Sequence, residues 1–291
     1  MLAAREWWRL IVDTVTAWSD DYAPSMGAAI AYYTLFSIAP LLVIVSAVAG
    51  FLFGQEAVNG ELYGQLRGLV GENGAEAIQA LVKSVSAPME GTFALVIGIV
   101  IMIIGATGVF SELQSALDRI WEVPKRQRSS TWLELIRTRL LAFGMLLSLA
   151  FLLLVSLVIS TAIAAVGMIW DYWLGHWEIV LQLVNILSSL VIFTIVFGLM
   201  YRYLPRTTVG WTDVWLGAIV TSVLFVAGKF LIGLYIGKSG IVSGFGAAGA
   251  LVTLLIWVYY SAQIFLLGAE FTWLFAHRYG SLRGTEKPRP A

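Results

Sequence analysis

Long apolar stretches separated by short polar segments dominate the pattern of this chain. Each stretch reaches the roughly 20 residues that a helix needs to cross about 30 Å of hydrocarbon. The stretches lie at residues 27–53, 92–111, 139–169, 179–201, 211–236 and 244–275. The pattern therefore predicts an all-α, polytopic membrane protein with six transmembrane helices, folded as a single domain over residues 1–291.

The segments outside these spans carry patterns of their own. Residues 1–26 place an apolar stripe on one helical face, made of Trp8, Ile11, Val12, Val15 and Trp18. This stripe predicts an amphipathic helix that lies either on the cytoplasmic leaflet or against the protein itself. We further expect an outer helical cap loop at 54–91, a cytoplasmic basic loop at 112–138 and a cytoplasmic tail at 277–291.

Composition supports the membrane class. The chain is 59% hydrophobic and 12% charged, with a mean hydropathy of +0.84, whereas soluble domains are about half apolar and a quarter charged. The formal net charge is zero, so no global basic field exists to bind nucleic acid. The absence of cysteine excludes disulfides and thiolate metal sites.

The cationic residues predict the orientation. If both termini are cytoplasmic, only Arg67, Lys83 and Lys238 fall in outer loops, while nearly all other Lys and Arg residues fall in cytoplasmic segments. This asymmetry follows the positive-inside rule, so we expect N-in and C-in. The basic residues Lys125, Arg126 and Arg128 either contact anionic lipid or only enforce this topology.

Four stretches resemble one known family. They are MGAAIAYYTLFSIAPLLVIVSAVAGFLFG (26–54), SELQSALDRIWEVP (111–124), YRYLPRTTVGWTDVWLGA (201–218) and GAAGALVTLLIWVYYSAQIFLLGAEFTWLFA (246–276). In this order they resemble the YihY/BrkB family of bacterial inner-membrane proteins. The resemblance implies six helices in the cell inner (cytoplasmic) membrane with both ends inside. Members are commonly described as transporters, with lipid or envelope-glycolipid movement among the proposals, and an older ribonuclease label is generally regarded as mistaken.

The sequence offers little for catalysis. Its two histidines, His176 and His277, fall on opposite sides of the predicted membrane, and no HxxxH, GxSxG or glycine-rich phosphate loop is present. Serines inside the spans suit packing and interhelical hydrogen bonds. We therefore expect no enzyme, no metal and no cofactor.

Charged residues inside the predicted spans are the first functional candidates, because a charge at a helix centre costs about 2.5–3.5 kcal/mol on translocon scales. Lys229 lies about 10 Å before the outer end of the fifth span, and either extends outward to the headgroups or lines a cavity. Glu270 lies near the inner end of the sixth span. The inner-mouth cations Arg119, Arg202 and Arg206 are its expected partners, in a structural ion pair or in a gate.

Uncharged polar residues extend the candidate set. Ser261 and Gln263 are expected at a depth comparable to that of Lys229, and Gln182 and Asn185 near the outer end of the fourth span can reach the same region.

The first span contains Pro40, which removes a helical hydrogen bond and predicts a kink. Tyr32, Tyr33 and Ser37 precede this proline and would line a gate or substrate path. Ordinary membrane-helix architecture is the alternative explanation.

Together these features predict a transporter that moves an anionic lipid or glycolipid substrate along a polar seam between spans one, five and six. The alternative is a non-transporting envelope scaffold or accessory protein. Membrane lipids are the expected partners, joined by an envelope protein under the scaffold reading. Nucleic acid is not expected, and the oligomeric state stays open.

Overall fold

The structure is a computed structural model that describes residues 4–53, 64, 75, 78, 79, 82, 83, 108–124, 178–238 and 249–284. The regular structure of these residues is entirely helical. Its main elements are α1 (Ala4–Asp20), α2 (Ala23–Phe53), a helix over 108–120, α7 (Glu178–Tyr203), α8 (Trp211–Lys238) and α10 (Gly249–Arg278). The predicted span 139–169, most of the predicted span 92–111, and Lys125, Arg126 and Arg128 lie outside the described residues.

Three helices in the described part of the chain are long and apolar enough to cross a membrane. They comprise Ile186–Tyr203, Trp211–Ile236 and Leu251–Arg278, which match the predicted fourth, fifth and sixth spans. The 31-residue α2 covers the predicted first span. The described residues thus have the all-helical fold and the apolar helices expected of a membrane protein, while the total of six spans and their orientation stay predictions.

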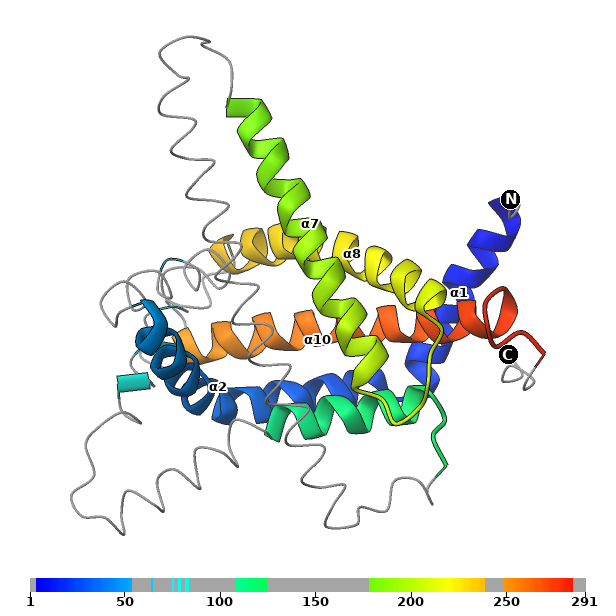
Figure 1. The fold of residues 1–291 in the computed structure, drawn as a ribbon, viewed down its shortest axis with the longest axis horizontal. Coiled ribbons are helices and arrows are strands. Elements are labelled where there is room, and N and C mark those ends of the chain that lie inside the picture. The colour runs from blue at the N-terminus through cyan, green and yellow to red at the C-terminus, as the bar shows by residue number, and fades with distance from the viewer. Residues whose placement is uncertain are drawn as a thin grey trace.

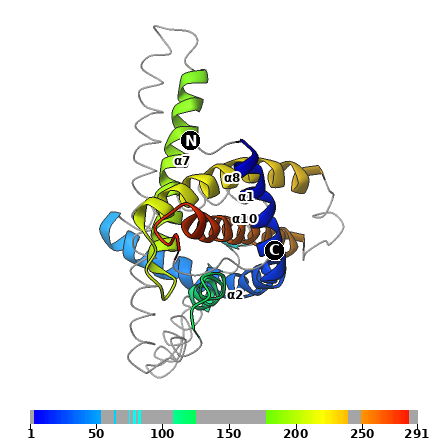
Figure 2. The same ribbon diagram turned by 90° about the vertical axis from the view of Figure 1, so that its right-hand side faces the viewer.

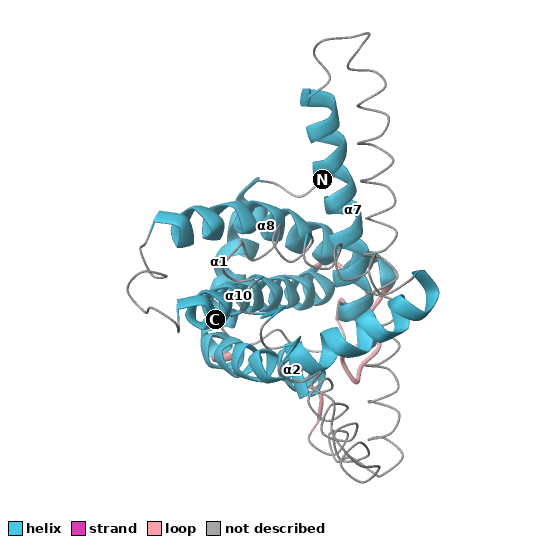
Figure 3. Ribbon diagram, turned by 90° about the vertical axis from the view of Figure 1, so that its left-hand side faces the viewer, coloured by secondary structure: helices cyan, strands magenta, loops and turns pink. Residues whose placement is uncertain are grey.

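The helix α10 lies at the centre of the arrangement. It packs against α8, α2 and α1, and α8 also packs against α7. Figure 1 shows α8 and α2 on opposite sides of α10, both running opposite to it, with the helix 108–120 beside α2. In Figures 1 and 3 α2 changes direction along its length. Pro40 lies within α2, and its lack of a backbone N–H removes a helical hydrogen bond and favours such a bend.

One end of the bundle gathers the end of α7, the start of α8 and the end of α10 (Figure 1). We call it the charged end, because Arg202, Arg206, Asp213 and Arg278 lie there. It is the end that the sequence predicts to be cytoplasmic.

Aromatic side chains fill the core between α7, α8 and α10. Phe197 and Phe225 are buried, with ring centroids 5.5 Å apart, and Tyr201 is completely buried with its ring 5.1 Å from that of Phe265. A second cluster joins α2 to α10 through small and branched apolar residues, including Ala31 and Leu254. Close packing of this kind supports helix association in lipid, where burial of apolar surface gives little driving force.

Glycine allows α8 and α10 to approach most closely at two points. A Cβ atom at Gly217 of α8 would overlap the side chain of Thr272 on α10, and a Cβ at Gly268 of α10 would overlap Thr221 on α8. Each threonine hydroxyl donates to the glycine carbonyl four residues earlier in its own helix, at 2.7 Å for Thr221 and 2.6 Å for Thr272. The two helices thus exchange equivalent contacts, and the hydroxyls of Thr221 and Thr272 are both paired.

Candidate functional site

Buried carboxyl groups mark the half of the bundle nearest the charged end. Asp118 and Asp213 are 1% exposed, Asp21 is 6% exposed and Glu270 is completely buried. They come from the helix 108–120, the start of α8, the corner between α1 and α2, and α10 respectively. Because an unpaired buried charge is costly, the partners of such groups define the structure around them.

Asp118 fastens the loop after α7 to the helix 108–120. Its Oδ1 accepts a hydrogen bond from the backbone N–H of Arg206 at 2.8 Å, and its Oδ2 lies 3.5 Å from Arg206 Nη1. One turn earlier, Gln114 Nε2 donates to the Leu204 carbonyl at 2.8 Å. On the same helix, burial raises the pKa of the Glu112 carboxyl above its usual value.

Asp213 fastens the start of α8 to the segment that follows α10. Its Oδ2 accepts hydrogen bonds from Ser281, from the backbone N–H at 3.0 Å and from Oγ at 2.6 Å. A Cβ atom at Gly280 would overlap the carboxylate, so only glycine leaves room for it there. A carboxylate in the first turn of a helix is also favoured by the helix dipole.

The cations at this end each contact a different element. Arg119 lies over the ring of Tyr22, 5.4 Å from its centroid, and Arg202 lies 5.5 Å from the ring centroid of Trp211. Arg202 also donates to the Val209 carbonyl. The sequence predicted Arg119, Arg202 and Arg206 at the inner mouth, and all three lie toward the charged end.

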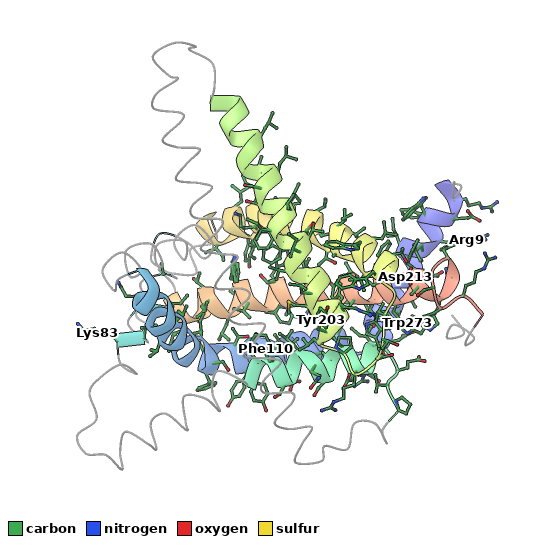
Figure 4. The ribbon with its side chains drawn as sticks, in the orientation of Figure 1. Arg9, Lys83, Phe110, Tyr203, Asp213 and Trp273 are labelled. Atoms are coloured by element: carbon green, nitrogen blue, oxygen red, sulfur yellow. The ribbon has the colours of Figure 1, made fainter. Side chains whose placement is uncertain are left out.

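Polar pairs at the charged end join all the elements that meet there. We call this set the charged-end ring, and it consists of Asp118–Arg206, Asp213–Ser281, Arg278–Asp13 and Arg119–Tyr22. The Arg278–Asp13 pair links the end of α10 to α1, with Nη1 and Oδ2 2.5 Å apart. Figure 4 shows Asp213, Trp273 and Arg9 toward this end, and Lys83 at the opposite end.

Lys229 lies half-buried on the part of α8 that is remote from the charged end. Its neighbours Phe230 and Leu231 are 69% and 58% exposed. On its other side, Gly228 packs so closely on Tyr260 and Ile264 of α10 that a Cβ would overlap both. Ser261 follows Tyr260, so Lys229 and Ser261 occupy neighbouring turns of the two helices.

Gln263 points to the other side of α10. Its Nε2 donates to the Ala23 carbonyl at the start of α2, at 3.4 Å, and a Cβ at Gly27 would overlap its amide. Its Oε1 is buried and has no hydrogen-bond partner within the described residues. Gln263 was expected at a depth comparable to that of Lys229; in the structure its side chain is directed to α2, whereas Lys229 lies on α8.

The α2 candidates differ in their surroundings. Tyr32 and Tyr33 are 58% and 44% exposed, and Ser37 is 2% exposed. A Cβ at Gly108 would lie 3.4 Å from Ser37 Oγ and 3.7 Å from Tyr33 Cδ1, so these two residues meet the helix 108–120. The side chains of Pro40, Gln182 and Asn185 lie outside the described part of the structure.

Several buried polar residues were not among the sequence candidates. Tyr201 Oη donates to the Phe265 carbonyl at 2.8 Å and lies 3.0 Å from Thr221 Oγ1, joining α7, α8 and α10. Asp118 and Asp213 were also missed. One usable signal was the spacing of Gln114, Leu117, Asp118 and Trp121, which puts two polar groups on the apolar face of a helix.

The fold and these sites define a helical membrane protein with a polar network at one end of its bundle. The sequence model of a family described as virulence factor BrkB matches residues 14–291, and the chain belongs to this family. The resemblance to YihY/BrkB proteins is thereby confirmed.

Named relatives of the chain are bacterial membrane proteins. A UPF0761 membrane protein of Azotobacter vinelandii is 27% identical over 290 residues, covering 98% of this chain and 66% of the relative. Another, from Ralstonia nicotianae, is 28% identical over 86% of this chain and 55% of its own length. The chain thus spans less than two thirds of these two relatives. No solved structure matches the chain.

Proposed function

We propose that this protein is a transporter of the bacterial inner membrane that moves an anionic lipid or glycolipid. The observation that carries the proposal is Lys229, a half-buried cation on an apolar candidate span beside the exposed side chains of Phe230 and Leu231. An anionic headgroup at Lys229 would leave its acyl chains against these apolar side chains.

Lys229 lies well inside the candidate span, where a charge is costly. Lys229 precedes Ile236, the end of the candidate span, by seven residues, or about 10 Å of helix. A cation at that depth is unfavourable unless water or an anion reaches it. A hydrogen bond to a charged group contributes about 1.5–3 kcal/mol, so an anionic headgroup would both stabilise the lysine and be selected by it.

The remaining polar groups support a route along α10. Ser261 lies on the turn next to Lys229, Gln263 reaches the start of α2, and Glu270 is completely buried nearer the charged end. The charged-end ring then acts as the closed inner gate of this route. Because the chain holds no nucleotide-binding motif, we expect movement to be driven by an ion gradient or by the lipid gradient itself.

Lipid movement in vesicles tests the proposal. The purified full chain would be reconstituted with phosphatidylglycerol or phosphatidylcholine carrying an acyl-chain fluorophore, and dithionite would report the exposed leaflet. Lys229→Gln should slow phosphatidylglycerol movement about 10- to 160-fold, the equivalent of the 1.5–3 kcal/mol above. Lys229→Arg should retain it, and the exposed Lys83→Gln serves as the matched control.

Two outcomes would overturn the proposal. If Lys229→Gln moves phosphatidylglycerol as fast as the unmodified chain, the lysine is not the headgroup site. If the unmodified protein moves no labelled lipid beyond protein-free vesicles, the alternative of a non-transporting envelope scaffold is favoured.

A further inference from the structure

The N-terminal helix α1 has three distinct faces. One face is buried against the bundle, with Leu10 completely buried and Thr14 4% exposed. Thr14 Oγ1 donates to the Leu10 carbonyl at 2.7 Å, so this face leaves no hydroxyl unpaired. The side of the helix that contacts α10 and α2 is therefore already occupied by the protein.

A second face of α1 is apolar and exposed. Trp8, Ile11, Val12 and Val15 are 67%, 49%, 44% and 50% exposed. We call these four residues the α1 stripe. Their spacing of three, four and seven residues places them on one side of a helix. Large exposed apolar patches mark sites that interact with a membrane, a protein or a ligand.

The third face is polar and borders the α1 stripe. Arg5, Arg9 and Thr16 are exposed, and at 100° per residue they project between the stripe and the buried face. An apolar stripe flanked by cations is the arrangement of helices that lie in a membrane interface. The two arginines also favour an anionic surface as the binding partner.

The position of α1 agrees with this arrangement. In Figures 1 and 2 α1 crosses the charged end of α10 at a steep angle. Trp7 stacks on Phe271 at 6.4 Å between ring centroids, and Asp13 pairs with Arg278, so two contacts fix the crossing. A helix that crosses a membrane span steeply runs along the membrane surface.

Exposed aromatic residues place a membrane interface at the same end of the bundle. Tyr203, Trp211 and Trp215, from the end of α7 and the start of α8, are 40–49% exposed. Their rings form a connected series, with centroids about 6 Å apart. Tyrosine and tryptophan collect at the headgroup level of membranes, so the interface lies at the end where α1 crosses.

We propose that α1 is an interfacial helix, with the α1 stripe in the acyl-chain region of the leaflet at the charged end. Arg5 and Arg9 contact the anionic phospholipid headgroups of that leaflet. This role does not depend on transport, and it commits the α1 stripe to lipid rather than to another protein.

Spin labels measure the depth of α1 directly, because the chain contains no cysteine to remove. Val12→Cys on the stripe and Thr16→Cys on the polar face would each carry a nitroxide in full-length protein in phosphatidylglycerol-containing vesicles. The label at residue 12 should collide several-fold more with oxygen than with a water-soluble nickel chelate. The label at residue 16, the matched control, should show the reverse.

Other patterns would overturn the inference. If both labels collide freely with the nickel chelate, the stripe lies in water. If the label at residue 12 is shielded from both reagents, a protein covers the stripe. The double variant Arg5→Gln/Arg9→Gln tests the headgroup contact. In the unmodified protein we expect the label at residue 12 to lie deeper in phosphatidylglycerol vesicles than in phosphatidylcholine vesicles. The double variant should abolish this difference in depth, and an unchanged difference would show that the two arginines do not contact the headgroups.

Discussion

At the scale of single residues, two Gly-x-x-x-Thr segments determine how closely α8 and α10 pack. Gly217 and Thr221 lie on α8, Gly268 and Thr272 lie on α10, and each glycine faces the threonine of the other helix. Tyr201 joins the same contact through Thr221 and the Phe265 carbonyl. A single added methyl group at either glycine has no free volume to enter.

We expect Gly268→Ala to destabilise the protein by about 1–3 kcal/mol, the usual cost of overpacking a closely packed site. Gly233→Ala is the matched control on α8, because no atom of the described residues lies within 4 Å of a Cβ at that position. The control should be neutral or more stable by about 0.5–1 kcal/mol, because alanine favours helix over glycine. Thermal unfolding in detergent, followed by circular dichroism, measures both, and equal effects would contradict the interlocked packing.

The sequence found some site residues and missed others for a physical reason. Lys229 and Glu270 were recognisable because charge inside a long apolar stretch stands out. Asp213 lies in the first turn of α8, where carboxylates are common, so only the folded chain reveals its burial, whereas the spacing of Asp118 from Gln114 and Trp121 was a usable signal. The contact of Gln263 with Ala23 depends on how far α2 and α10 are offset along each other, which hydropathy does not encode.

At the scale of elements, the hydropathy pattern predicted helix positions to within a few residues. The predicted spans 179–201 and 211–236 correspond to Glu178–Tyr203 and Trp211–Lys238. Span length is set by membrane thickness, so it is readable from the sequence. The order of the helices around α10 is set by side-chain fit between distant segments, and the pattern alone could not supply it.

Asp118 links two of these elements, so its removal should loosen the loop 204–210. In Asp118→Ala the Arg206 N–H and guanidinium lose their Asp118 acceptors, which should cost about 1–3 kcal/mol. Amide hydrogen exchange at residues 204–210 should quicken accordingly. Asp20→Ala, at an exposed position, is the control, and equal protection in the two variants would show that the Asp118 contacts do not hold the loop.

At the scale of the whole molecule, the predicted topology puts Thr16 and Lys83 on opposite sides of the membrane. Figure 4 shows Lys83 and α1, which carries Thr16, at opposite ends of the structure. A membrane-impermeant maleimide should label Lys83→Cys in spheroplasts, whose outer membrane is removed and whose inner membrane is intact. Thr16→Cys should react only after the inner membrane is opened. Labelling of both sites in intact spheroplasts would contradict the N-in orientation.

The reciprocal glycine–threonine contacts limit how this bundle can rearrange. Each threonine sits in the recess of the opposite glycine, so sliding α8 along α10 in either direction drives a threonine against a helix backbone. The two helices are thus locked in register and must tilt as one rigid body. If the protein is the transporter proposed above, a conformational change that exposes Lys229 and Gln263 in turn takes place where this body meets α7, α2 and α1.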